Sequence, residues 1–68
     1  MKIKNRLLEI RLKKGYKFQK DFAEFLGIGQ YQYNRHEKNK IQPNLETTFM
    51  ILKKLDIDFF ELYYKDND

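Results

Sequence analysis

The 68-residue sequence contains no cysteine, no serine and no tryptophan, and only one proline, three glycines and one histidine. Without cysteine the chain can form neither a disulfide nor a zinc–thiolate site. Without serine or cysteine, and with His36 as the single histidine, the usual pairs of a nucleophile and a base are also missing. We therefore expect no catalytic site, no metal site and no cofactor.

Long hydrophobic runs are missing too, since the longest clear aliphatic and aromatic stretch covers only residues 49–52. A membrane-spanning helix needs about 20 apolar residues. Residues 1–6 (MKIKNR) carry charge at every second position, in place of the apolar segment of a signal peptide. We expect a cytoplasmic protein that is neither secreted nor inserted in a membrane.

A chain of this length forms a single domain with a thin core, because folding at this size removes only about 60% of the unfolded surface from water. A net stability of about 3–5 kcal/mol is typical of such domains unless something adds buried surface. Association with a second subunit is therefore an option for this protein.

The charge is distributed unevenly along the chain. Residues 1–20 hold eight basic residues against one acidic residue, a net charge of +7, whereas residues 46–68 hold three basic against six acidic residues, a net charge of −3. A protein that presents one face to nucleic acid has this kind of asymmetry. A basic surface that serves solubility alone is the other interpretation, so the charge has to be weighed together with the motifs.

Apolar residues recur at helical spacing between short punctuating segments, which predicts an all-α fold. Gly15, Gly27 and Pro43 separate the first four helices, and Asn44 and Asp58 are placed to cap the last two. We expect helices over residues 2–14, 19–26, 30–37, 45–55 and 59–64, a domain over residues 1–64 and a polar tail over residues 65–68. The side chains expected to face the core are Ile3, Leu7, Ile10, Phe22, Ala23, Leu26, Tyr33, His36, Glu37, Leu45, Phe49, Leu52 and Leu55.

Residues 19–37 have the spacing of two short helices that cross at a steep angle. Ala23 is small where the second helix would pack over the first, Gly27 allows the turn, and Tyr33 can fill the wedge between the helices. This arrangement is the helix-turn-helix motif.

With this motif in place, the chain resembles the lambda-repressor-like (Cro/XRE) family of helix-turn-helix regulators over about residues 3–63. The same order of signals extends across five predicted helices, which makes the resemblance more specific than a single motif. The residues that carry it are Arg6-Leu7, Glu9-Ile10-Arg11, Gln19, Ala23, Leu26-Gly27-Ile28, Tyr33, Arg35, Glu37, Lys40, Pro43, Asn44-Leu45-Glu46-Thr47 and residues 55–62.

The resemblance implies a compact five-helix bundle that binds double-stranded DNA as a homodimer. Its third helix would enter the major groove, and a palindromic operator would have half-sites about 34–36 Å apart. The function implied is that of a transcriptional regulator, which we expect to be a repressor without a small-molecule effector. The residues in base-reading positions are Gln30, Tyr31, Asn34 and Arg35.

The resemblance also implies residues that position the protein on DNA. Gln19 corresponds to a glutamine that holds a phosphate and steadies the first base-reading residue, here Gln30. Arg11 and Glu37 correspond to a semi-buried ion pair between the first and third helices. Further phosphate contacts are expected from Lys17, Lys38, Asn39 and Lys40.

The chain departs from the family pattern in three places. One extra residue lies between Gly15 and Gln19, and Phe18 stands where a serine or threonine would cap the second helix. Gly29 replaces the usual cap of the third helix, and Lys38-Asn39 stands where Asn-Gly is usual. The start of the second helix and the loop after the third helix are therefore the places where the structure is expected to differ.

Four apolar residues, Leu8, Leu12, Phe60 and Tyr64, lie where charged residues are common. Either the first and last helices cover them within one subunit, or they form a patch that pairs two subunits. The competing function is a binding module of the same fold directed at a protein, such as an antitoxin or an anti-repressor.

Overall fold

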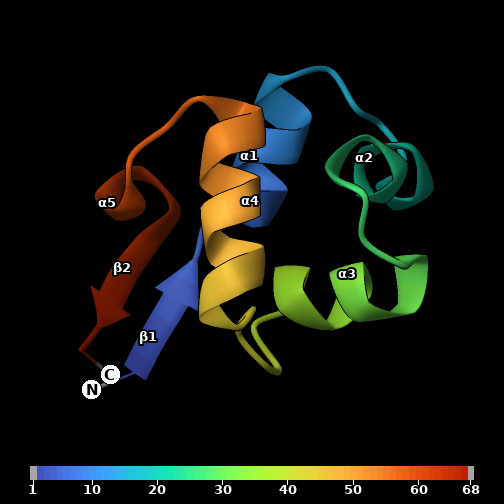
Figure 1. Ribbon diagram of the computed structural model, residues 1–68. Coiled ribbons are helices and arrows are strands. Elements are labelled where there is room, and N and C mark those ends of the chain that lie inside the picture. Colours follow the sequence, from blue (N-terminus) through green and yellow to red (C-terminus); the bar gives the residue numbers. More distant parts are fainter. Residues whose placement is uncertain (1, 68) are drawn as a thin grey trace.

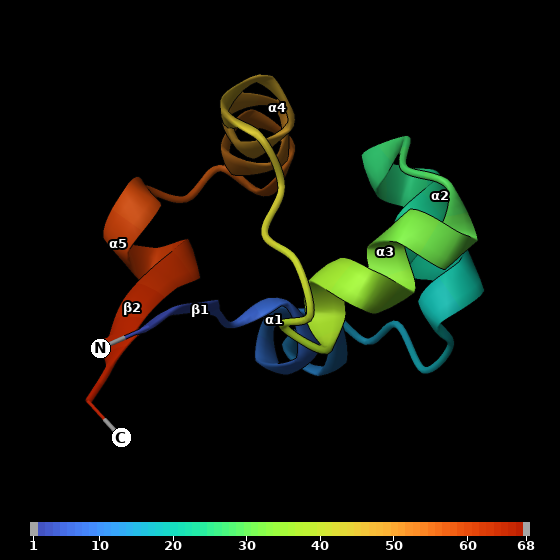
Figure 2. The same ribbon diagram turned by 90° about the horizontal axis from the view of Figure 1, so that it is seen from below.

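The computed structural model describes residues 2–67, which form five helices and two short strands (Figure 1). In two perpendicular views, α2 and α3 lie at one side of the molecule and α5 with both strands at the other, with α1 and α4 between them (Figures 1 and 2). In chain order the elements are β1 (Lys2–Asn5), α1 (Leu7–Lys13), α2 (Gln19–Leu26), α3 (Gln30–Glu37), α4 (Leu45–Leu55), α5 (Phe59–Leu62) and β2 (Tyr63–Asp66).

The bounds predicted for α2, α3 and α4 are confirmed, and local chemistry explains them. Helix α2 ends at Gly27, whose φ of 79° lies in the left-handed region that glycine tolerates. Helix α4 begins after Asn44, whose side chain accepts a hydrogen bond of 2.8 Å from the Thr47 amide. Helix α5 begins with a reciprocal capping box between Asp58 and Glu61.

The all-α prediction is wrong at the two ends of the domain, where β1 and β2 pair antiparallel with Ile3 opposite Lys65. Residues 2–5 form this strand rather than the first turn of a helix, so α1 begins only at Leu7 and α5 ends at Leu62. Strand β2 includes two residues of the predicted polar tail; residue 68 of that tail lies outside the described residues. The fold is thus a five-helix domain whose two ends are joined by a small sheet.

Asn5 explains why the N-terminal segment is not helical. Its side-chain oxygen accepts from the Leu7 amide at 2.9 Å, while its Nδ2 donates to the His36 carbonyl at 2.8 Å and to Gln42 at 2.7 Å. A helix continuing back through Asn5 would require its backbone to bond within the helix, in competition with these contacts. The same contacts attach the chain start to the end of α3.

The core lies where α1, α2, α3, α4 and α5 meet. Phe22 packs edge-on against Tyr33 with the ring centroids 5.6 Å apart, and Ala23 is fully buried where α3 crosses α2. His36, predicted to be a core residue, is buried with its Nδ1 3.1 Å from the Ile41 carbonyl. The buried apolar residues are Leu7, Phe22, Ala23, Leu26, Tyr33, Ile51, Leu55, Leu62 and Tyr63.

The predicted buried face of α4 is confirmed at Leu55, which is buried, and at Leu52, which packs against the core, but it is wrong at the other two expected core residues. Leu45 and Phe49, expected in the core, are 73% and 70% exposed, whereas Thr48 and Ile51 are buried. Both faces of α4 carry apolar residues at helical spacing, so periodicity alone does not separate them. The buried face can include Thr48 because its hydroxyl lies 2.7 Å from the hydroxyl of Tyr63 on β2.

Candidate nucleic-acid interface

Helices α2 and α3 are joined by a tight turn that leaves one face of α3 uncovered. The amide of Ile28 donates to the Ala23 carbonyl at 2.9 Å, which closes the end of α2. Gly29 then begins α3 without a side-chain cap, as glycine can. Tyr33, His36 and Glu37 face inward, so the orientation of α3 is fixed from its buried side.

The opposite face of α3 carries groups that can make hydrogen bonds to base edges. Gln30 and Tyr31 are exposed, the latter by 74%, and Asn34 and Arg35 are half-exposed. The Arg35 guanidinium carbon lies 5.8 Å from the centre of the Tyr31 ring, one helical turn away. The four residues expected to contact bases thus lie on α3, outside the set that it buries.

A network around Glu37 connects α3 to α1 and α2. The Arg11 Nε donates to Glu37 Oε1 at 2.8 Å and forms an ion pair with it, and the Tyr33 hydroxyl donates to the same oxygen at 2.6 Å. The Gln19 Nε2 donates to Glu37 Oε2 at 2.7 Å. Both charged side chains are more than nine-tenths buried, so the pair lies out of water. The network therefore fixes where α3 sits relative to the rest of the domain.

The charges of this network are held in place by its hydrogen bonds. Burial raises the pKa of Glu37, but the hydrogen bonds from Arg11, Tyr33 and Gln19 outweigh it and keep that pKa below its usual range. The hydrogen bond to Glu37 raises the pKa of Arg11. Burial, together with the hydrogen bond to Glu37, raises the pKa of the Tyr33 hydroxyl. At neutral pH the network consists of a cation, an anion and a neutral phenol.

Arg11 also explains how the longer loop before α2 is accommodated. Its Nη1 donates to the backbone carbonyls of Tyr16 and Lys17 at 3.1 and 2.7 Å. Phe18 precedes α2 without a side-chain cap and is 61% exposed. The loop with the extra residue is therefore held by its backbone, and α2 still begins at Gln19.

Gln19 contacts a different residue of α3 than the resemblance implies. Its Oε1 accepts from the Asn34 Nδ2 at 2.9 Å, so Gln19 bridges Glu37 and Asn34, whereas Gln30 was the expected partner. Asn34 lies one helical turn after Gln30, and its side chain contacts Gln19 at the start of α2. The sequence spacing permits either pairing, and only the packed structure distinguishes them.

Basic side chains flank this face on two loops. Lys17 precedes α2, and Lys38 and Lys40 follow α3, and all three are exposed. Lysines in such positions can contact phosphates without reading sequence.

Asn39, which we also expected to contact phosphate, has a structural role in its own loop. Its φ of 60° lies in the left-handed region that asparagine tolerates better than most residues. Its Oδ1 accepts from the Asn5 amide at 2.8 Å and from Gln42 Nε2 at 2.9 Å. This explains how Lys38-Asn39 can replace the usual Asn-Gly, and it identifies Asn5 and Gln42 as loop-holding residues that sequence reasoning missed.

Of the four apolar residues that either pack within the subunit or form a patch between subunits, three are not covered within the subunit. Leu8, Leu12 and Phe60 are exposed, the last by 81%, so the interpretation that the first and last helices bury them is wrong. Tyr64 is half-buried, with the Arg6 guanidinium 4.5 Å from the centre of its ring.

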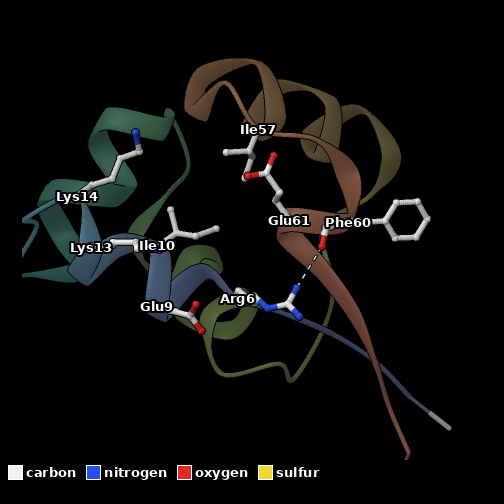
Figure 3. Close-up of a pocket in the computed structure, with 8 residues that line it drawn as sticks. All are labelled: Arg6, Glu9, Ile10, Lys13, Lys14, Ile57, Phe60 and Glu61. Atoms are coloured by element: carbon white, nitrogen blue, oxygen red, sulfur yellow. Dashed lines mark hydrogen bonds between the residues drawn. The ribbon is translucent and has the colours of Figure 1, made fainter.

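A shallow depression between α1 and the α5 end of the domain carries charges of both signs (Figure 3). Arg6, Lys13 and Lys14 line it together with Glu9 and Glu61. The Arg6 side chain turns toward the Phe60 carbonyl and donates to it at 3.2 Å (Figure 3). Because basic and acidic side chains both line it, this depression does not form a surface of one sign for a polyanion.

Residues 2–67 contain neither a cluster of metal-binding side chains nor a membrane-spanning helix. Among residues 2–67, no group of three or more histidine, aspartate or glutamate side chains is arranged to hold a metal ion. No helix within those residues is long and apolar enough to cross a membrane.

Comparison with known proteins agrees with the geometry of α2 and α3. Residues 7–62 match a family model described as helix-turn-helix, and the match includes all five helices. A comparison with curated proteins gave no match.

Proposed function

The chain belongs to the Cro/XRE-type helix-turn-helix family of DNA-binding transcription regulators, and on this premise we propose that it is a sequence-specific repressor that acts in the cytoplasm as a homodimer. The observation that supports this most is the two-sided nature of α3. Its inner side is fixed by Tyr33 and the Glu37 network, and its outer side is free to contact DNA.

The outer residues of α3 have the chemistry for direct reading of bases in the major groove. Gln30 can pair with adenine through its amide, and Arg35 can pair with guanine through its guanidinium fork; each good pair contributes about 1–3 kcal/mol of discrimination. Tyr31 can contact a thymine methyl group or a phosphate. The contact between Arg35 and Tyr31 holds the two side chains close together on the exposed face.

Phosphate contacts set the register of α3 on the duplex. Lys17, Lys38 and Lys40 lie on the loops that flank the helix-turn-helix, and Gln19 lies at the N-terminal end of α2. Helix N-termini favour anions because their amides are unpaired and their dipole is positive. These contacts supply affinity that depends on salt but not on sequence.

Dimerisation is proposed through an exposed apolar face formed by residues of β1, α4 and α5. We define the α4–α5 face as Ile3, Leu45, Phe49, Phe59 and Phe60. Ile3, Leu45 and Phe59 line one depression, Ile3, Phe59 and Phe60 line the adjoining one, and Phe49 lies one helical turn after Leu45. Several exposed large apolar residues close together on a small domain are typical of a surface that another subunit covers. A second copy on this face would generate the two-fold symmetry that a palindromic operator requires. A dimer bound across an operator would repress by excluding other proteins from that DNA.

Selection of bound duplexes from a randomised double-stranded pool, at near-physiological salt, tests the proposal. The parent protein should recover a palindromic motif, and Gln30→Ala and Arg35→Ala should each lose preference at different positions of it. The matched control is Gln32→Ala, an exposed amide on α3 outside the proposed base-reading set. If only salt-sensitive, sequence-blind binding is found, and both variants behave like the parent, the repressor proposal fails and a protein partner becomes the better account.

A further inference from the structure

We propose that Asn34 selects a base with an exocyclic amino group, adenine or cytosine. Arg11 holds Glu37, Glu37 orients Gln19, and Gln19 in turn fixes which half of the Asn34 amide faces outward. This inference rests on the proposed function, and it specifies the chemistry of one base contact. Gln19 is in this view a positioning residue, which acts on the DNA contact through Asn34.

The chain of hydrogen bonds that orients Asn34 starts at the buried ion pair between Arg11 and Glu37. The ionised carboxylate of Glu37 can only accept hydrogen bonds, and it is held beside Arg11 with Nε and Oε1 2.8 Å apart. Gln19 must therefore turn its Nε2 toward Glu37, at the observed 2.7 Å. The opposite rotation of the Gln19 amide would place its carbonyl oxygen against a carboxylate oxygen, where neither atom can donate.

The orientation of Gln19 then determines the orientation of Asn34. With its Nε2 on Glu37, Gln19 presents its Oε1 to Asn34, and only the Nδ2 of Asn34 can donate to that oxygen, at 2.9 Å. The nitrogen and oxygen of an amide are ordinarily assigned from the hydrogen-bond network around them. Here the buried carboxylate of Glu37 fixes the amide orientation of Gln19 and, through it, that of Asn34.

The Oδ1 of Asn34 is consequently the half of the amide that faces away from Gln19. Within residues 2–67, every buried side-chain nitrogen or oxygen has a hydrogen-bond partner. No residue in that range donates to Asn34 Oδ1, and the residue is half-exposed, so this oxygen lies at the surface. Asn34 lies one helical turn after Gln30, on the same side of α3.

An outward oxygen can pair only with a donor. In the major groove the base-edge donors are the N6 amino group of adenine and the N4 amino group of cytosine, whereas guanine O6 and N7 and thymine O4 are acceptors. Phosphate oxygens are acceptors too, so the exposed Oδ1 suits a base contact rather than a phosphate contact. Gln30 is exposed and can rotate its amide to suit either kind of base edge.

The test uses the operator recovered with the parent protein and measures binding by fluorescence anisotropy. The position at which Asn34→Ala loses its preference is first identified by substituting each base pair in turn. At that position the amino group is then removed, with purine in place of adenine or 2-pyrimidinone in place of cytosine. Thermal unfolding establishes that each variant is folded at the assay temperature.

The parent should bind the amine-free duplex about fivefold to tenfold more weakly than the operator. Removal of the amino group also weakens base pairing in the duplex, and this effect is the same for every protein. In Asn34→Ala the loss of affinity should be no larger than this effect, so the same two duplexes are compared in both proteins. Gln19→Met should lose discrimination at the same position, and the double variant should lose no more than either single variant. Because the readout is a ratio between two duplexes, any phosphate interaction that Gln19→Met removes weakens both equally and cancels out. Gln32→Ala should behave like the parent.

The outcomes separate this inference from the proposed function. If the parent recovers no motif, both fail. If a motif is recovered but Asn34→Ala changes no position in it, or if amine removal weakens the parent and Asn34→Ala equally, only the role of Asn34 is overturned. Discrimination that survives in Gln19→Met overturns the positioning role of Gln19.

Discussion

Arg11→Met should lower the free energy of unfolding by about 3–5 kcal/mol, because it leaves the Glu37 carboxylate buried without its cation. The whole net stability expected for a domain of this size is about 3–5 kcal/mol. The variant should therefore be largely unfolded at 25 °C, with the loss of its helical circular dichroism signal as the measurement. The aliphatic part of the Arg11 side chain is retained in methionine, so the effect comes mainly from the lost charge and hydrogen bonds.

The double variant Arg11→Met/Glu37→Gln is the matched control. The glutamine leaves no charge in the site and can still accept from the Tyr33 hydroxyl, so this variant should be more stable than Arg11→Met by at least about 1 kcal/mol. Equal stability of the two variants would contradict the view that an unpaired charge is the cause. A fully folded Arg11→Met protein would mean that the ion pair does not hold α3 in place.

The free energy of unfolding of the parent should fall as the pH is lowered, as expected when folding stabilises an ionised carboxylate. The pKa of Glu37 is lowered in the folded protein, so its contribution to stability is fully present above the unfolded pKa of about 4.3. That contribution is lost as the pH falls through the folded pKa. Urea unfolding as a function of pH should therefore show a steeper loss of stability below about pH 4.3 in the parent than in the double variant.

Phe49→Lys should raise the dissociation constant of the homodimer by about 30-fold or more, the effect of removing an interface residue worth at least about 2 kcal/mol. The phenyl ring is 70% exposed in the subunit and forms part of the α4–α5 face. A charged group there would be desolvated when two copies associate. Sedimentation equilibrium measures the change, and the thermal unfolding of the monomer should change little because Phe49 lies outside the core.

Leu12→Lys tests the other exposed apolar region. Leu12 is 57% exposed on α1 and does not line either depression of the α4–α5 face. Its replacement should change the dissociation constant less than threefold, on the order of the few tenths of a kcal/mol typical of surface substitutions. If Leu12→Lys dissociates the dimer and Phe49→Lys does not, the interface lies on α1. If the parent is monomeric at micromolar concentration and on DNA, the homodimer proposal itself is wrong.

Much of the helix-turn-helix could be predicted because its signals are local. Gly27 ends α2, Asn44 caps α4, and Tyr33 turns inward between two polar residues; each feature depends on a few neighbouring residues. The ion pair between Arg11 and Glu37 is not local, and it was expected only through the family resemblance.

The features that the sequence did not predict depend on contacts between distant segments. Strand β1 forms because β2 is available to pair with it and because Asn5 is bound by residues more than thirty positions away. The burial of Thr48 on α4 depends on Tyr63 of β2, whose hydroxyl is the hydrogen-bond partner of the Thr48 hydroxyl. Periodicity places Leu45 and Phe49 on one stripe with Leu52 and Leu55, and only the packed structure shows that the first two are exposed.

In the candidate site, too, some features depend on neighbouring residues and others on contacts between distant segments. Helical spacing in the sequence predicts which residues of α3 face inward and which remain outside the core, whereas the proposed base-reading role of the outer residues comes from the family resemblance. The contact of Gln19 with Asn34 is not visible in the sequence, because it depends on the separation of α2 and α3 after packing. The role of Asn39 in its own loop likewise depends on Asn5.

The central claim is that α3 of this protein reads the major groove of a specific DNA sequence. Dimethyl sulfate footprinting of the recovered operator tests it most directly, since this reagent methylates guanine N7 in the major groove and adenine N3 in the minor groove. We predict protection of guanine N7 in two patches about 10 base pairs apart, centre to centre, with adenine N3 between and beside them still reactive. Protection confined to adenine N3, or no protection at protein concentrations that saturate binding, would contradict the account.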